Sequence, residues 1–141
     1  MNPAVILAVS AGVAIALQVV ANSIGLRDLG LGGLIGLSGL TTALAGLAWA
    51  LFAARPEASG RALLCAIASG LLGAFIVGSI VLAANRGGLA QTLSLVIASQ
   101  LVFGLAIDRL GVFGPVAQGV GLLKVFGLLL IVAGGVLVVR A

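Results

Sequence analysis

Charged residues are so rare in this chain that long apolar runs dominate it from end to end. Of its 141 residues, Lys, Arg, Asp and Glu together make up 7%, whereas 62% are hydrophobic. An ordinary globular domain has about a quarter of its residues charged, which helps it to cover its surface with polar groups. A chain with so few polar groups cannot cover a water-facing surface. We therefore predict an integral membrane protein.

The residue types that are missing or scarce exclude several kinds of chemistry. The sequence has no histidine, no tyrosine and a single cysteine, Cys65. These counts exclude a zinc site of the Cys/His type, a Ser-His-Asp or Cys-His catalytic pair, and an internal disulfide. No pair of carboxylates is placed for acid–base chemistry either. We predict that the chain is not an enzyme and uses no metal and no other cofactor.

The net charge of +4 resembles that of a nucleic-acid-binding protein, but its distribution does not. The seven Lys and Arg residues are scattered singly along the chain. A surface that follows a phosphate backbone needs its cations clustered. We therefore predict no nucleic-acid partner.

The charges and the Gly/Pro clusters divide the chain into five segments that could each cross a bilayer. A spanning helix needs about 20 mostly apolar residues. The start, Met1-Asn2-Pro3, lacks the basic region of a signal peptide, so the first segment is interpreted as a retained helix. The predicted fold is an all-α membrane protein with one five-helix domain over residues 1–141. The expected helices cover 3–26, 29–54, 61–84, 89–107 and 119–139, with a connector over 110–118.

Five crossings would place the two termini on opposite sides of the membrane, with the cations divided almost evenly. The two sets of connecting cations are Arg55, Arg61 and Arg109 on the N-terminal side, and Arg27, Arg86 and Arg140 on the other. Lys124 could extend to the N-terminal side. Orientation follows the Lys and Arg bias, which is very small here. Two interpretations stay open: a weak bias selects one topology, or copies insert both ways or pair with an oppositely biased partner.

Small residues recur every four positions along the third expected helix. Lipid gives helices no hydrophobic reason to associate, so close packing through small residues must bring them together. A second, shorter run with the same four-residue spacing joins Ser69 and Gly73. Packing within one chain and packing across a dimer are both open interpretations of this face. The predicted helix-packing residues are Ala66, Gly70, Ala74 and Gly78.

Polar side chains inside the apolar segments are costly in hydrocarbon and should face protein or a wet cavity. The candidates are Gln18, Asn22, Ser38, Thr42 and Gln100. Ser and Thr can bond to carbonyls of their own helix, which favours a structural role for them. Gln18 and Gln100 lie near mid-bilayer depth, and each amide carries four hydrogen-bonding sites. For these two amides, lining a cavity and joining two helices are both open interpretations.

No Asp, Glu or His lies in the middle of an expected helix. Carriers coupled to protons or cations usually need an ionisable group there. Asp108 directly precedes Arg109 and is interpreted as a local ion pair or helix-end anchor. Lys124 lies near a helix end, where its side chain is expected to reach the membrane surface, with attraction of an anionic head group as the alternative. We therefore do not predict exchange through a buried carboxylate.

Several motifs together resemble one family of small bacterial membrane proteins. The motifs are NSIG at 22–25, GLLGAF at 70–75, IASQL at 97–101 and IDRLGVFG at 107–114. They resemble the patterns of the domain-of-unknown-function-606 family, also called the YdcZ-like family, of the drug/metabolite transporter superfamily. The resemblance covers nearly the whole chain. Two departures are Ser38, which is followed by Gly39 instead of Phe, and Lys124, where Arg is frequent.

The resemblance implies a multi-pass half-transporter in the bacterial inner membrane. Full-length relatives have ten helices in two inverted halves, so this chain would complete the fold as an antiparallel dimer of dual topology. The dimer would contain a second copy or a paralogous five-helix partner, surrounded by membrane lipids. Inverted repeats place the substrate site near the midplane between the halves.

The expected function is that of a transporter subunit that moves a small organic or amphipathic solute, lipids included, by alternating access. The candidate substrate-binding residues are those named above: Gln18, Asn22, Ser38, Thr42 and Gln100. The alternative is a non-transporting subunit that uses its small-residue faces to brace a larger membrane complex.

Overall fold

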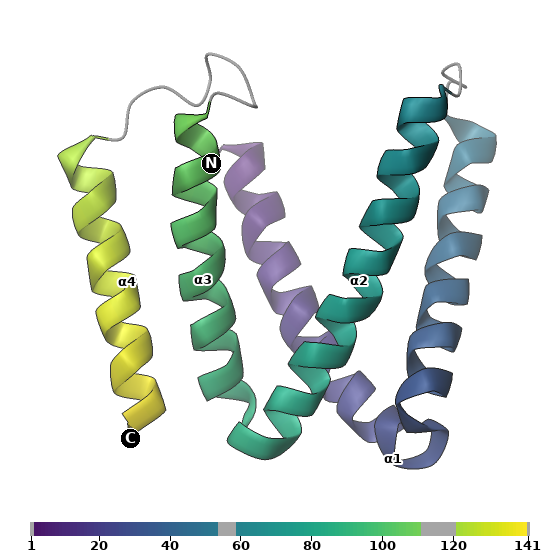
Figure 1. The fold of residues 1–141 in the computed structure, drawn as a ribbon, viewed down its shortest axis with the longest axis horizontal. Helices are drawn as coiled ribbons and strands as arrows, with labels where there is room; N and C mark the ends of the chain where they lie inside the picture. The colour runs from purple at the N-terminus through teal and green to yellow at the C-terminus, as the bar shows by residue number, and fades with distance from the viewer. Residues whose placement is uncertain (1, 54–58, 111–120, 141) are drawn as a thin grey trace. The chain divides into compact units, whose positions relative to one another are not determined.

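The computed structural model describes residues 2–53, 59–110 and 121–140, and these residues are almost entirely helical. The four helices are α1 (Pro3–Phe52), α2 (Gly60–Gly87), α3 (Leu89–Arg109) and α4 (Leu122–Arg140) (Figure 1). Each is long and apolar enough to cross a membrane. The predicted class, an all-α chain with the helices of an integral membrane protein, is therefore confirmed for the described residues.

The helices belong to two compact units, Met1–Asn85 and Arg86–Ala141. The N-terminal unit contains α1 and nearly all of α2, and the C-terminal unit contains α3 and α4. Three predicted helices match α2, α3 and α4 within a few residues at each end. Arg55 and the connector expected after Leu110 lie outside the described residues, as does the end of the fourth motif, 111–114.

α1 is 50 residues long and is broken at Gly30, whose φ of 65° and ψ of 172° are not helical. Figure 1 shows α1 reversing its direction in this region. A positive φ is accessible to glycine because it has no Cβ. The predicted boundary at Arg27 and Asp28 is therefore wrong by a few residues: both remain helical, because the backbone freedom of Gly30 and not the charge determines where the helix breaks.

The N-terminal unit is held together where small residues let helices approach. A Cβ at Gly25 would lie 3.2 Å from Cδ1 of Leu34, across the break in α1. A Cβ at Gly78 of α2 would lie 3.3 Å from Cδ1 of Ile35. Near the end of α2, Nδ2 of Asn85 donates to Oγ of Ser23 at 3.2 Å. Both parts of α1 are thus joined to α2.

In the C-terminal unit α3 and α4 pack against each other through Gly135. A Cβ at Gly135 would lie 3.6 Å from the carbonyl oxygen of Ser94 and 3.8 Å from its Cβ. The hydroxyl of Ser94 donates to the Ala90 carbonyl at 2.8 Å and therefore stays within its own helix. The pair is built on backbone proximity, as small residues permit in lipid.

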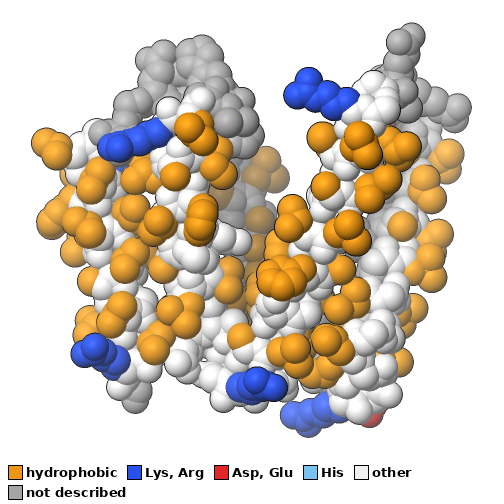
Figure 2. All heavy atoms as spheres, viewed as in Figure 1, with side chains coloured by type: hydrophobic (Ala, Val, Ile, Leu, Met, Phe, Trp, Pro, Cys, Tyr) orange, Lys and Arg blue, Asp and Glu red, His pale blue; other side chains and the backbone are white. Residues whose placement is uncertain are grey.

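Most large apolar side chains are exposed in the single chain. Among the described residues, the buried hydrophobic side chains are Val19, Leu34 and Val81. Trp49, in contrast, is 77% exposed. Figure 2 shows hydrophobic side chains along the helices and Lys and Arg side chains at their ends. This distribution fits helices whose sides face lipid or another membrane protein and whose ends face water.

Candidate functional site

Each unit contains a pocket that brings polar side chains together. The pocket of the N-terminal unit, called here the N-terminal groove, has a volume of about 520 Å³ and is formed by α1 and α2. Its lining residues are Gln18, Ile35, Ser38, Gly39, Thr42, Ala43, Ala66, Ser69, Gly70, Gly73, Ala74 and Val77. Three of the five predicted substrate-binding residues, Gln18, Ser38 and Thr42, thus share this groove.

One wall of the N-terminal groove presents hydrogen-bond acceptors. The hydroxyl of Ser38 donates to the Ile35 carbonyl at 3.1 Å, and that of Thr42 donates to the Ser38 carbonyl at 2.9 Å. Each hydroxyl hydrogen is therefore used inside the helix, and the oxygen lone pairs remain to accept a further bond. Gln18 adds an exposed amide that can both donate and accept. The wall suits a solute that carries N–H or O–H donors.

The opposite wall consists of small residues of α2. Ala66, Gly70 and Ala74, predicted as packing residues, line the groove. No described atom outside the neighbouring backbone of α2 lies within 4 Å of a Cβ placed at Gly70, whereas Gly78 packs against Ile35. The missing side chains create the volume of the groove. Packing by Ala66, Gly70 and Ala74 against a second chain stays a prediction.

Asn22 does not line the N-terminal groove. It is 8% exposed, one helical turn beyond Gln18. Its neighbour Ser23 accepts the hydrogen bond from Asn85.

Ser69 and Gly73 do line the groove. Their spacing was visible in the sequence as a small-residue pattern, but that pattern alone cannot distinguish a packed face from an open one.

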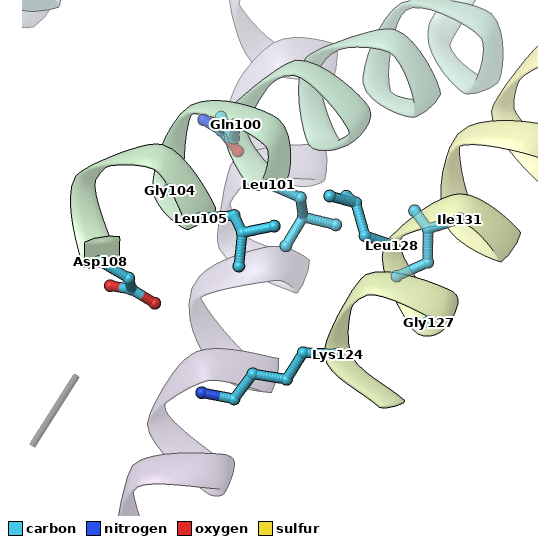
Figure 3. A pocket seen from close by; sticks show the side chains of 9 residues that line it. All are labelled: Gln100, Leu101, Gly104, Leu105, Asp108, Lys124, Gly127, Leu128 and Ile131. Atoms are coloured by element: carbon cyan, nitrogen blue, oxygen red, sulfur yellow. The ribbon is translucent and has the colours of Figure 1, made fainter. Parts of the chain in front are cut away.

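The pocket of the C-terminal unit, called here the C-terminal pocket, has a volume of about 400 Å³ and lies between α3 and α4. Gln100 is the predicted substrate-binding residue that lines it. The complete lining, drawn in Figure 3, is Gln100, Leu101, Gly104, Leu105, Asp108, Lys124, Gly127, Leu128 and Ile131.

The C-terminal pocket is polar at both ends and apolar between them. Asp108 lies in the last turn of α3 and Lys124 in the first turn of α4. In Figure 3 the Lys124 side chain extends toward the end of the pocket where Asp108 lies. Gln100 is near the middle of α3, eight residues before Asp108, which is about 12 Å along the helix axis. Apolar side chains of both helices occupy the stretch between these two ends.

The sequence identified Asp108 and Lys124 as helix-end residues without relating them to each other. The structure places them in one lining, from different helices. The available signal was the i+4 spacing of Gln100, Gly104 and Asp108, which puts these three on one face of α3. In the part of the chain that the structure describes, no cluster of three or more His, Cys, Asp or Glu could hold a metal ion.

One family of known proteins matches almost the whole chain. The pattern of the family described as "Putative inner membrane exporter, YdcZ" matches residues 3–137. The match spans the N-terminal groove and the C-terminal pocket. No curated protein and no solved structure matches the chain.

Proposed function

The chain belongs to the YdcZ family, whose description is that of an inner membrane exporter, and from this premise we propose that it is a transporter subunit for a small organic or amphipathic solute. The observation that carries the proposal is the N-terminal groove, in which Gln18, Ser38 and Thr42 meet between otherwise apolar helices. Burying polar side chains within the hydrocarbon layer costs free energy. Because these three side chains line the same groove, we infer that they bind a solute.

The groove selects its solute by hydrogen bonds and not by charge. None of the residues that line it is charged. The lone pairs of Ser38 and Thr42 accept bonds, and the Gln18 amide supplies a donor and a further acceptor. The expected solute is therefore uncharged, carries hydroxyl or amide donors, and fits a volume of about 520 Å³.

The transporter is completed by a second five-helix subunit in the opposite orientation. The break at Gly30 supports two crossings by α1, which gives five crossings in each chain. The even division of Arg residues between the two membrane sides supports insertion of copies both ways or pairing with a paralogue. Inverted repeats of this kind alternate access around a site near the midplane.

A direct test of the groove replaces Gln18 by Leu. Vesicles containing the full chain are loaded with uncharged radiolabelled solutes that carry hydroxyl or amide donors, chloramphenicol among them, and release is followed. We expect release above that of protein-free vesicles, reduced about tenfold in Gln18→Leu. Ser10→Ala is the control, because its hydroxyl bonds to Leu7 of its own helix, away from the groove. Equal release by Gln18→Leu and the unaltered chain would contradict the role of the groove.

The proposed assembly is tested by the accessibility of tags on both termini in intact cells. Accessible and protected copies of each tag, or a co-purifying partner of opposite orientation, are expected. A single fixed topology without a partner would exclude the antiparallel dimer.

A non-transporting assembly subunit is the second candidate, and one observation favours it. The face at Gly70 has room for another helix, since no described atom outside the neighbouring backbone of α2 lies within 4 Å of a Cβ there. If this face braces a complex, Gly70→Leu should dissociate that complex. If the groove holds solute, the same substitution should block transport and leave the assembly intact.

A further inference from the structure

The C-terminal pocket contains two opposite charges that the proposed recognition in the N-terminal groove does not use. Asp108 is half-buried and Lys124 is exposed, and both line the same end of the pocket. A carboxylate only accepts hydrogen bonds, whereas an ammonium only donates them. A ligand group with a single charge would be attracted by one of these residues and repelled by the other. A zwitterionic group is complementary to both.

The remainder of the pocket determines what must follow such a head group. Leu101 and Leu105 of α3 and Leu128 and Ile131 of α4 form apolar walls beyond the charged end. The ligand must therefore have an apolar middle, because burying polar groups against these walls without partners costs free energy.

The Gln100 amide favours a ligand that also carries a hydrogen-bonding group at its far end. It lines the pocket about 12 Å along α3 from Asp108. A plain hydrocarbon chain would cover this amide and offer it no hydrogen bond, which is unfavourable. A hydroxyl or carbonyl group at that depth would satisfy it.

We propose that the C-terminal pocket binds a zwitterionic amphiphile with a polar group at its far end. The ammonium of the head group lies at Asp108, its anionic group at Lys124, and the far hydroxyl or carbonyl at Gln100. This site extends the proposed function. It rests on one part of that proposal, namely that the chain is embedded in a membrane. Its test measures binding without transport.

The test uses the purified full chain in a neutral detergent and four single-chain probes. α-Amino-ω-hydroxyoctanoic acid has all three features, and α-aminooctanoic acid lacks the far hydroxyl. Octylamine lacks the carboxylate, and octanoate lacks the ammonium. Calorimetric titration should show the first probe binding about tenfold more tightly than octylamine or octanoate, with α-aminooctanoic acid between them. Equal affinities for all four probes would overturn the proposal, and this comparison depends on no variant.

Substitutions assign each feature to its residue. Asp108→Asn should remove the preference of the pocket for the zwitterion over octanoate, and Lys124→Gln its preference over octylamine. Gln100→Leu should remove only the advantage of the far hydroxyl. The matched control is Ser99→Ala, beside Gln100, because the Ser99 hydroxyl donates to the Val96 carbonyl at 2.9 Å and does not line the pocket. Unchanged preferences in all three variants, each checked for its helical content, would overturn the assignment.

The outcomes separate this site from the proposed transport function. Binding with the expected preferences but no solute movement in vesicles would retain the C-terminal pocket and contradict transport. Solute movement through Gln18 without any zwitterion preference would retain transport and overturn the pocket.

Discussion

The two units use similar apolar helices to present different chemistry. In the N-terminal groove, one wall carries hydroxyl groups and an amide, all uncharged, and the other wall consists of small residues. The C-terminal pocket has charged side chains at one end, an amide at the other and branched apolar side chains between them. A chain with very few charges can therefore combine one pocket lined by uncharged polar groups with another that has opposite charges at one end.

In both units some glycines pack against another helix and others face open space. Gly78 and Gly135 lie where another helix is close, at Ile35 and Ser94 respectively. At Gly70 and Gly134, in contrast, a Cβ would have no described atom within 4 Å outside the neighbouring backbone of its own helix. Packed and open glycines therefore occur on the same helices, and substitution should separate them.

The largest effect is expected from Gly135→Leu in the C-terminal unit. A Cβ fits at 3.6 Å from the Ser94 carbonyl oxygen, but the outer carbons of leucine would force α3 and α4 apart. Overpacking of this kind costs about 3 kcal/mol, measured as the free energy of unfolding in mixed detergent. The control is Gly134→Leu, which faces open space among the described residues. Equal stability of the two variants would contradict the packing through Gly135.

A smaller loss of stability is expected in the N-terminal unit from Gly30→Ala. The φ of 65° and ψ of 172° suit glycine alone, so any Cβ strains the break in α1 by about 2 kcal/mol. Gly32→Ala is the matched control, since Gly32 has an ordinary helical backbone and open space. Thermal unfolding followed by circular dichroism measures the difference. A Gly30 variant as stable as the control would show that α1 can break elsewhere.

Gly70→Leu should reduce solute transport without reducing the stability of the chain. Because the position is open, the free energy of unfolding should change by less than about 0.5 kcal/mol. The leucine side chain would nevertheless fill the N-terminal groove, so vesicle transport of uncharged solutes should fall about tenfold. The zwitterion preferences of the C-terminal pocket should not change. Loss of both activities together would show that the two sites are not independent.

The smallest effect is expected from removing one acceptor of the N-terminal groove. Ser38→Ala deletes one hydrogen-bonding oxygen, and a single hydrogen bond contributes about 1 kcal/mol, equivalent to a change of roughly fivefold in apparent affinity. Concentration-dependent transport of chloramphenicol measures it. Thr41→Val is the control, because Thr41 bonds to the Leu37 carbonyl and does not line the groove. If Ser38→Ala changes the apparent affinity no more than Thr41→Val does, the Ser38 hydroxyl does not contribute to solute binding.

Part of the candidate site could be predicted from the sequence because helical spacing determines which residues share a face. Ser38 and Thr42 are four residues apart and Gln100 and Asp108 are eight residues apart, so each pair lies on one face of its helix. Spacing along one helix does not reveal which other helix lies opposite. It could not relate Lys124 to Asp108, or distinguish the open face at Gly70 from the packed contact at Gly78.

The sequence by itself determined that the chain forms helices apolar and long enough to span a membrane, the ends of three of them to within a few residues, and the family to which the chain belongs. Hydrophobicity and sparse charge act locally, so they can be read residue by residue. Only the tertiary structure decided that α1 breaks at Gly30, that Asn22 is buried outside the groove, and that Asp108 and Lys124 share a pocket. These features depend on backbone geometry and on contacts between different helices, which the spacing of residues along one helix does not encode.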